Sequence, residues 1–543
     1  MIIPALSSYY ERLANDPEID IAPQGFSRQK IAFRIVVDRN GKAQIQDNRE
    51  QRGKKLLPRQ FIVPGWAKPS GSGLNPCFLW DNTAYALGYK PDDETPKRTL
   101  EAFEAFRTRH IELESEIDDI QFKLVCEFLR RWNPAQITEL DKAAMTEIGA
   151  GFCVFKIQGE ANFVHEQPAI QTWWLSQLIS ESASSEQSQC LVTGATQPIA
   201  RLHAPKIKGV VGAQSCGAAI VSFNFDASES YGKEQGFNAP VSEQVAFQYA
   251  TALNRLLDSR QRIQIGDATT VFWTEAPTEA ENWLGGAFGT NASEDEGTKR
   301  KLDAILQTVR KGGMPSELGD ADTDFYILGL SPNAARLSIR FWLRTTVGEL
   351  LTSLGQHFRD LQIVGSERDP EFPMFWQILR ETARESKDIP PLLSGALMRA
   401  ALTGSEYPQA LFSAVLRRIR ADHRINAVRG AIIKAYLVRN GRLKTNNNKE
   451  IAMSLDPDRE EASYHMGRLF AQLEKAQEDA QPGINKTIKD RFFSAASATP
   501  TSVFPRIIRL NQHHIAKLER GTKVYHERRI QEICSKFGEF PSH

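Results

Sequence analysis

The chain has 543 residues, 41% hydrophobic and 24% charged, a composition typical of a folded soluble protein. No apolar run approaches the ~18 residues that cross a membrane, and the N-terminal residues lack a secretory pattern, so we expect a cytoplasmic protein without membrane contact. The six cysteines include no Cys-x-x-Cys pair, which favours reduced thiols over a zinc site or disulfide framework.

Charge is distributed unevenly, although the net charge is only +1. Residues 21–70 hold 11 bases and 3 acids, and residues 395–543 hold 25 bases and 15 acids. Local excesses of this kind are typical of surfaces that contact nucleic acids. Solvated helical faces produce the same pattern, so charge alone leaves both interpretations open.

Hydrophobic periodicity predicts strands and helices in mixed order over the first two thirds of the chain. The expected strands are 31–37, 43–45, 151–163, 218–225, 269–273, 325–330 and 336–342. The expected helices are 1–14, 97–128 and 242–257. Residues 39–42 suit a hairpin turn, and residues 180–189 suit an exposed loop.

Beyond residues 385–394 the pattern becomes almost entirely helical. The expected helices are 411–420, 428–439, 457–480 with Asp456 as N-cap, and 502–520 ending at Gly521. We therefore predict an α+β fold: an N-terminal body of mixed sheets and helices over residues 1–394, followed by an all-α helical bundle over residues 395–543.

A first candidate for nucleic-acid binding is a loop rich in glycine and serine. Glycines let the backbone approach a ligand closely, and amides, hydroxyls and a lysine can bind bases or phosphates. Its candidate residues are Lys68, Ser70, Gly71, Ser72, Gly73 and Asn75. A plain surface turn is the alternative. The neighbouring Trp80 could stack on bases, but its apolar surroundings favour a core position.

A second candidate consists of two glycine-rich, amide-bearing loops around the expected strand 218–225. Neutral amides and hydroxyls suit base edges, and lysines suit phosphates. Its candidate residues are Lys206, Lys208, Gln214, Ser215 and Asn224. Structural roles at strand ends are the alternative here.

Basic helices near the C-terminus form the third candidate, with phosphate contacts as the functional interpretation and a solvated face as the other. The residues are Arg417, Arg418, Arg420, Arg424, Arg429, Lys434, Arg439, Arg506, Arg509 and Lys517. No motif for a phosphate-binding loop, metal site or nucleophile–base pair accompanies them. We therefore expect no cofactor, no metal and no catalytic residue.

Several blocks along the chain resemble the large subunit of the type I-C CRISPR Cascade complex. Besides residues 209–240, they are Phe78-Leu79-Trp80-Asp81-Asn82 with 85–88, then 324–336, 455–459, 489–493 and 497–500. The resemblance implies a non-catalytic subunit that recognises a protospacer-adjacent motif in double-stranded DNA and promotes R-loop formation. It also implies a small-subunit-like C-terminal bundle that stabilises the displaced non-target strand.

The resemblance further implies several partners. They are the crRNA, target DNA, the Cascade backbone and crRNA-processing subunits, a helicase-nuclease, and a small subunit translated from within the same gene. Met398 is a candidate internal start, whereas a start at Met453 omits two basic helices. Two other functions stay open: a metal-dependent nuclease using Asp322, Asp324 and Asp360, and a structural scaffold that binds crRNA but not DNA.

Overall fold

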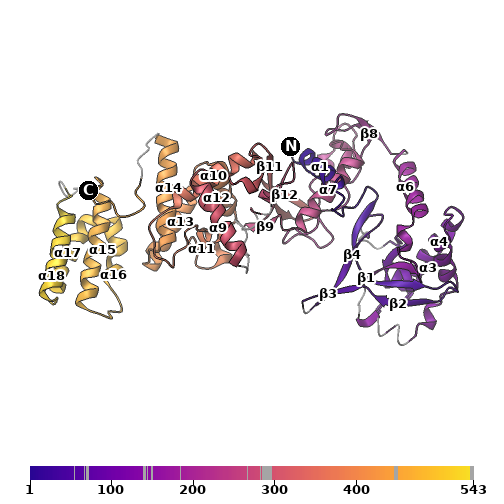
Figure 1. Ribbon diagram of the computed structural model, residues 1–543, viewed down its shortest axis with the longest axis horizontal. Helices are drawn as coiled ribbons and strands as arrows, with labels where there is room; N and C mark the ends of the chain where they lie inside the picture. Colours follow the sequence, from indigo (N-terminus) through magenta and orange to yellow (C-terminus); the bar gives the residue numbers. More distant parts are fainter. Residues whose placement is uncertain are drawn as a thin grey trace. The chain divides into compact units, whose positions relative to one another are not determined.

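Figure 1 shows the computed structural model of the chain. It describes residues 1–53, 55–66, 68, 73–138, 142, 145–147, 151–183, 185–265, 267–281, 283, 296–445 and 451–537. The chain divides into two compact units. The first unit comprises Met1–Arg262, Thr269–Pro277 and Asp324–Arg344. The second unit comprises Ile263–Ala268, Thr278–Thr323 and Thr345–His543.

The first unit combines helices with two sheets and a small strand pair. Its strands are β1 (Phe26–Val37), β2 (Ala43–Asp47), β3 (Arg49–Arg52), β4 (Lys55–Pro64), β5 (Trp80–Asn82), β6 (Phe152–Ile157), β7 (Gln187–Gln189), β8 (Thr196–Pro198), β10 (Ala268–Thr274), β11 (Asp324–Asn333) and β12 (Arg336–Thr346). Its helices are α1 (Ile2–Ala14), α2 (Thr83–Leu87), α3 (Pro96–Glu112), α4 (Ile120–Arg131), α6 (Pro168–Ala183) and α7 (Glu243–Leu257).

Strand β1 is the centre of the larger sheet, whose order is β3-β4-β1-β6-β5, with β2 also paired to β1. β1 runs antiparallel to β4 and parallel to β6. The predicted hairpin is confirmed, because Val37 lies opposite Ala43 in the β1–β2 pair. Helices α3 and α4 bury aromatic side chains against this sheet, with the rings of Phe106 and Phe128 at 6.1 and 6.3 Å from that of Phe155.

A second core of the first unit lies between α1, α7 and the sheet that contains β10, β11 and β12. The expected helix 1–14 is confirmed as α1, whose side chains Leu6, Tyr9, Tyr10 and Leu13 are all buried. α7 begins where predicted because Ser242 Oγ accepts a hydrogen bond from Val245 N at 3.3 Å, an N-cap contact. The expected strands over 269–273, 325–330 and 336–342 are confirmed as β10, β11 and β12.

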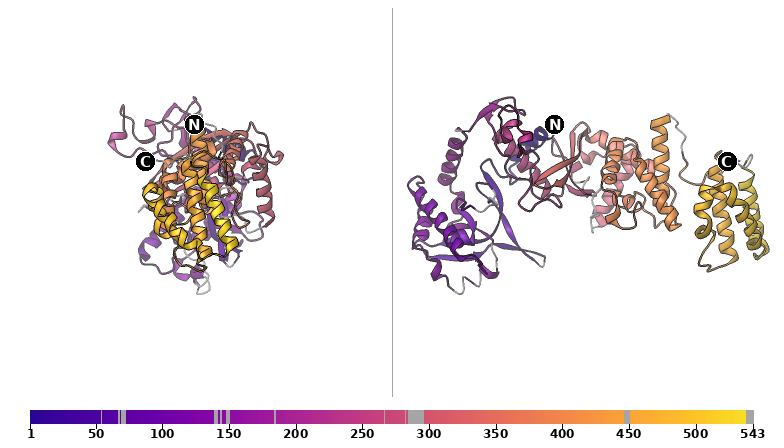
Figure 2. Two further views of the ribbon diagram at one scale, coloured as in Figure 1. Left: turned by 90° about the vertical axis from the view of Figure 1, so that its left-hand side faces the viewer. Right: turned by 180° about the vertical axis from the view of Figure 1, so that it is seen from behind.

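The second unit is helical apart from the short strand β9 (Arg262–Ile265). Its helices are α9 (Glu296–Arg310), α10 (Val347–Leu361), α11 (Phe375–Arg380), α12 (Pro391–Thr403), α13 (Gln409–Asp422), α14 (Ala427–Thr445), α15 (Ala462–Ala480), α16 (Ile488–Ala498), α17 (Pro500–Ile515) and α18 (Arg520–Cys534). Figure 2 shows α15–α18, in yellow, gathered side by side, and they share a core of their own around Leu469, Leu473 and Phe504.

The predicted α+β class is confirmed, with sheets toward the N-terminus and helices toward the C-terminus. The boundary between units differs from the predicted one. The second unit includes Thr278–Thr323 and resumes at Thr345, and the predicted boundary after Ser394 lies inside α12. Among the described helices, none combines the length and the apolarity that a membrane crossing requires.

The expected strand 218–225 is wrong. Only its first two residues form isolated bridges, Ala218 with Ile207 and Ala219 with Arg336, and the rest is turns and coil. The two bridges go to different partners and in opposite senses, so no continuous ladder forms, and the preceding Gly217 has φ +94°. The expected loop 180–189 is also wrong, because α6 continues to Ala183 and β7 begins at Gln187.

Other differences concern helix boundaries. The region 97–128 forms two helices, α3 and α4, separated by a short 3-10 turn at Leu113–Ser115. Asp456 does not cap a helix, because its Oδ1 accepts the backbone N–H of Asp458 in a local turn and α15 begins later. The expected last helix is two helices, and Gly521 lies within α18 rather than at a C-terminus.

Candidate nucleic-acid interface

The first candidate loop is tied down at both of its described ends. Lys68 Nζ donates to Asp81 Oδ2 at 2.5 Å and to the Asn75 carbonyl at 2.7 Å, and lies 3.2 Å from the centre of the Tyr85 ring. The Tyr85 hydroxyl in turn accepts the backbone N–H of Asn75 at 3.2 Å. Ser70, Gly71 and Ser72 lie outside the described residues. The charge of Lys68 is therefore already matched by a carboxylate.

That carboxylate is fully buried beneath the loop. Burial raises the pKa of Asp81, and the ammonium of Lys68 opposes this shift. Asp81 also accepts the backbone N–H of Cys77 at 2.9 Å. The predicted core role of Trp80 is confirmed, since its side chain is buried, and Asn82 caps α2. Gly73 and Asn75 are exposed at the surface beside the anchored Lys68.

The second candidate presents its lysines on a backbone that α7 fixes. Asn254 of α7 accepts the backbone N–H of Lys208 at 2.8 Å and donates to the carbonyl of Lys206 at 3.0 Å. Ile207, between them, is buried and bridges to Ala218. Both lysine side chains are exposed, and within the described part of the chain neither has an ion-pair partner. The positive charges of these two lysines are thus exposed and are not neutralised by a described carboxylate.

The amide-bearing residues of the second candidate lie nearby in sequence but have different surroundings. Gln214 and Ser215 are exposed, and Gln214 Oε1 accepts the thiol of Cys216 at 3.5 Å. Asn224 Oδ1 accepts a hydrogen bond from Arg336 of β12. Asn224 therefore ties its loop to the sheet, whereas Gln214 is available to a ligand.

A basic groove runs beside these lysines in the first unit, with a cavity of about 470 Å³. Its walls come from β1, the loop before it, β4, the Lys206–Gly209 segment and α7. The groove is lined by six bases and two acids, a balance of +4: Arg28, Lys30, Lys206, Lys208, Arg255 and Arg262, with Asp20 and Asp258. The structure thus brings together bases from two separate parts of the sequence.

Sequence reasoning did not single out the β1 contributors to this groove. Arg28 and Lys30 are exposed, whereas Ser27, Gln29 and Ile31 are buried, because successive side chains of a strand point to opposite faces. The available signals were this alternation and the excess of bases over residues 21–70. Neither signal indicates which distant segment of the chain lies opposite β1.

Most of the positive charge in the groove is not neutralised by the protein. Arg28 pairs with Asp20 at 2.9 Å, and Asp258 Oδ2 accepts from Gln60 at 3.1 Å. Arg262 donates to the Leu257 carbonyl at 2.9 Å, a neutral acceptor. In the described part of the chain, Lys30 and Arg255 form no ion pair. A concave surface of this charge concentrates anions such as phosphate groups.

The predicted basic helices of the second unit divide into exposed and engaged residues. The exposed ones are Arg417, Arg420, Arg424, Arg506, Arg509 and Lys517. Arg418 pairs with Asp422 at 2.5 Å, and Lys434 donates to the Asp360 carbonyl at 3.0 Å.

Two of the predicted arginines are in the interior. Arg429 pairs with Glu381 at 2.6 Å and with Asp422 at 2.7 Å. Arg439 is fully buried, pairs with Asp360 at 2.7 Å and lies over the Tyr407 ring at 4.3 Å. Contact with a DNA strand would require both side chains to leave these pairs.

Two of the three carboxylates considered for a nuclease are also engaged. Asp324 pairs with Arg344 at 2.7 Å, which holds the pKa of its carboxyl below the usual value, and Asp360 pairs with Arg439. The backbone N–H of Asp322 bonds to Asp320 Oδ1. Among the residues that the structure describes, no group of three or more His, Cys, Asp or Glu could hold a metal ion.

Comparison with known proteins identifies one family. The family described as CRISPR-associated protein (Cas_Csd1) matches residues 6–543, nearly the whole chain. No curated protein matches the sequence.

Proposed function

The chain belongs to the Cas_Csd1 family of CRISPR-associated proteins, and on this premise we propose that it is the large subunit of a type I-C Cascade complex. In this role it is non-catalytic. It recognises a protospacer-adjacent motif in double-stranded DNA, promotes R-loop formation on a crRNA guide, and helps to recruit a separate helicase-nuclease. The resembling sequence blocks support the choice of subunit.

The basic groove of the first unit is the observation that carries this proposal. Six bases from β1, α7 and the segments beside them line one cavity with two acids. Phosphate contacts position a protein on a duplex but carry no sequence information, whereas polar side chains at base edges do. Exposed Gln214, Ser215 and Asn75 are the described candidates for that reading.

A binding role of this kind requires no reactive centre. Replacing DNA pairs by RNA–DNA pairs is nearly balanced in free energy, so small contributions from protein–backbone contacts tip the exchange. A groove that holds the duplex beside the motif supplies such contacts. Cleavage then belongs to the helicase-nuclease partner.

The second unit has a corresponding role on the displaced strand. Its exposed bases, among them Arg417, Arg420 and Arg509, suit contacts to a single-stranded phosphate backbone. For a small subunit translated from the same gene, Met398 is a poor start because it lies buried inside α12. Met453 precedes all of α15–α18, so a product that begins there includes these helices whole.

The test is binding of the assembled complex to matched duplexes with the motif intact or scrambled. Wild type is expected to prefer the intact motif. Lys206→Ala/Lys208→Ala is expected to weaken binding to both duplexes equally, and Gln214→Ala or Asn75→Ala to reduce the preference. A wild-type complex that binds both duplexes alike would contradict motif recognition and favour the scaffold function.

A further inference from the structure

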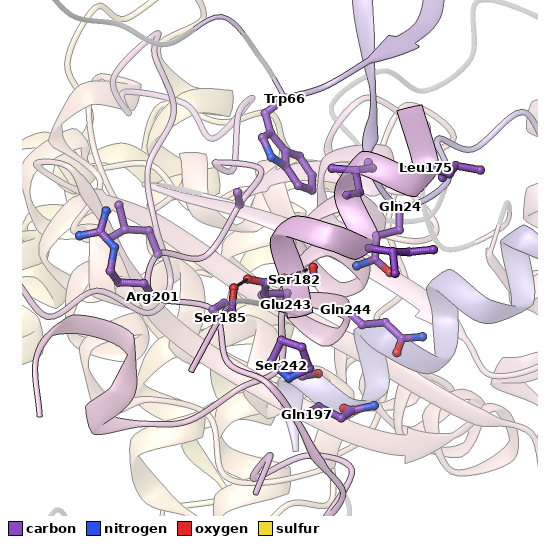
Figure 3. A pocket seen from close by; sticks show the side chains of 18 residues that line it. Gln24, Trp66, Leu175, Ser182, Ser185, Gln197, Arg201, Ser242, Glu243 and Gln244 are labelled. Carbon is purple, nitrogen blue, oxygen red and sulfur yellow. Dashed lines mark hydrogen bonds between the residues drawn. The ribbon is translucent and has the colours of Figure 1, made fainter. Parts of the chain in front are cut away.

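A second cavity of the first unit differs in chemistry from the basic groove. It has a volume of about 750 Å³, within the range of ligand sites. Its walls are the segment before β1, Trp66 after β4, α6, the segment after β8 and the first turn of α7 (Figure 3). Among the residues that the structure describes, its lining includes one base, Arg201, and one acid, Glu243.

The exposed aromatic ring of Trp66 lies at this cavity, and the surrounding contacts fix its position. Trp66 is 40% exposed, and its ring centre lies 5.6 Å from that of Phe247 in α7. The Gly25 carbonyl accepts the backbone N–H of Gly65 at 2.8 Å and the indole N–H of Trp174 at 2.9 Å. Gly25 has φ +87°, and a Cβ there would lie 2.0 Å from Leu178. The position of Trp66 is therefore set by close packing.

Aliphatic side chains supply the other walls. Leu175 and Ile179 of α6 are 42% and 72% exposed, and Leu202 is 60% exposed. Flat, unstacked bases bind between aromatic and apolar side chains of this kind. In Figure 3, Trp66 and Leu175 lie on the same side of the cavity, at a distance from Gln197.

The polar side chains among the described lining residues are three neutral amides, three hydroxyls and the two charged groups. Gln24 and Gln244 are exposed, and within the described residues their side chains form no hydrogen bond. An amide can donate and accept at once, which suits the edge of a base. Glu243 is already occupied, because its two oxygens accept from Ser182 at 2.8 Å and Ser185 at 3.2 Å.

One cation also lines the cavity. Arg201 is exposed, and its Nη1 donates to Gln235 Oε1 at 3.0 Å, which leaves its other donors available to an anion. The flat apolar surface matches the face of a base, the two free amides match the edge of that base, and the arginine matches a phosphate. An apolar peptide would use the aliphatic walls but would bring no anion to Arg201.

We propose that this cavity binds a single nucleotide of an RNA or DNA strand. The base leaves its neighbours in the strand and stacks on Trp66, the edge of the base lies at Gln24 and Gln244, and the phosphate lies at Arg201. The inference rests on the proposed nucleic-acid role of the chain and adds a base-holding site to it. The basic groove would hold the backbone of a duplex, whereas this cavity holds one extruded base.

The test uses the full chain and fluorescein-labelled single strands of RNA and DNA with the same sequence. Trp66→Ala is expected to weaken binding by about 5- to 150-fold, the range of one stacked base. Trp66→Phe, which keeps an aromatic face, should retain most of the affinity. The matched control is Trp376→Ala, because Trp376 of α11 is also 40% exposed but does not line the cavity.

Gln244→Ala is a second variant, since this exposed side chain contributes no described packing contact and its loss should leave the fold intact. A several-fold loss of affinity is expected. A loss of affinity confined to RNA would identify the guide as the source of the nucleotide. A loss confined to DNA would identify the target as the source. Either result supports the site. Crosslinking of an iodinated uracil in the strand to Trp66 would also support it.

The proposal is overturned if Trp66→Ala and Trp376→Ala bind both strands as wild type does, or if an apolar peptide competes for the cavity and nucleotides do not. If Lys206→Ala/Lys208→Ala still weakens duplex binding in that case, the proposed function survives and only the base site fails. If wild type binds no nucleic acid at all, both fail.

Discussion

Burial decides what the charged residues of this chain can do. Arg439 and Asp360 are 0% and 1% exposed, and Arg442 also reaches Asp360 at 3.2 Å. In sequence, Arg439 belongs to a row of bases and Asp360 is one of three carboxylates considered for a nuclease. Their pairing makes both structural, because a buried charge is tolerated only with a partner.

Replacing Asp360 by alanine should therefore destabilise the second unit strongly. The change leaves Arg439 buried without its carboxylate, and such a loss costs about 3–5 kcal/mol. The free energy of unfolding in urea, followed by circular dichroism, measures it. Asp118→Ala is the control, since Asp118 forms its ion pair with Lys123 at an exposed site. Equal urea midpoints for the two variants would contradict the structural role.

A buried histidine should make the stability of the first unit depend on pH. His110 accepts the Leu79 N–H at 3.0 Å, and burial lowers its pKa to about 3. The unfolded chain takes up this proton below about pH 6.5, whereas the folded unit excludes it. Stability is therefore lost as pH falls from about 6.5 toward 3, by up to about 1.4 kcal/mol per pH unit.

The measurement compares urea midpoints from pH 7 to pH 4.5 for wild type and His110→Gln. The variant lacks the titrating ring, so its stability should fall less steeply with pH than that of wild type. Parallel pH profiles would show that His110 does not contribute to the dependence.

At the scale of single residues, the sequence predicted core positions better than surface functions. Trp80 was expected in the core on its apolar surroundings, and it is buried. Arg429 and Arg439 were expected at a nucleic-acid surface, and they are interior. Helical periodicity identifies an apolar face, but a carboxylate from a distant helix leaves no local pattern.

At the scale of elements, the contact between α7 and the lysine segment is the feature on which the groove depends. Asn254 makes two hydrogen bonds to the backbone of Lys206 and Lys208, so a helix that packs in the core also positions charges at the surface. The sequence predicted α7 itself, because Ser242 and the apolar period are local signals. It could not predict which segment Asn254 would hold.

Asn254→Ala should release the lysine segment without changing charge. We expect nucleic-acid affinity to fall less than in Lys206→Ala/Lys208→Ala, with the salt dependence of binding close to that of wild type, because both lysines are still present. Fluorescence anisotropy at several salt concentrations checks this. An unchanged affinity would mean that the segment keeps its position without Asn254.

Gly521 illustrates a limit of prediction at this scale. A glycine after an apolar helical run suggests a C-terminal cap, but here it lies in the first turn of α18, after α17 has ended at Ile515. A glycine inside a helix costs only about 1 kcal/mol relative to alanine, which is small enough for tertiary packing to decide where the helix breaks.

At the scale of the whole molecule, the chain passes more than once between its two units. A sequence read from one end suggests consecutive domains, and the predicted boundary at 394/395 reflects that expectation. The structure instead assigns Thr278–Thr323 to the second unit because α9 packs on α10. Contacts between segments distant in sequence cannot be found from composition.

The α15–α18 helices should fold without the rest of the chain, since they share a core formed only by their own residues. A fragment that begins at Met453 is expected to be helical and to unfold cooperatively on heating. Circular dichroism measures both properties. Leu469→Ala, at a fully buried position, should lower the free energy of unfolding by about 2–5 kcal/mol. A fragment without helical signal would contradict an independent core.

The most direct test of the central claim, that the basic groove of the first unit contacts nucleic-acid phosphates, is the salt dependence of DNA binding. Lys206→Ala/Lys208→Ala should reduce the slope of log affinity against log salt by about 2, as expected for two lost phosphate contacts. Lys90→Ala/Lys97→Ala removes the same charge from exposed sites outside the groove and should leave the slope unchanged. Equal slopes for both double variants and wild type would contradict the assignment of the groove.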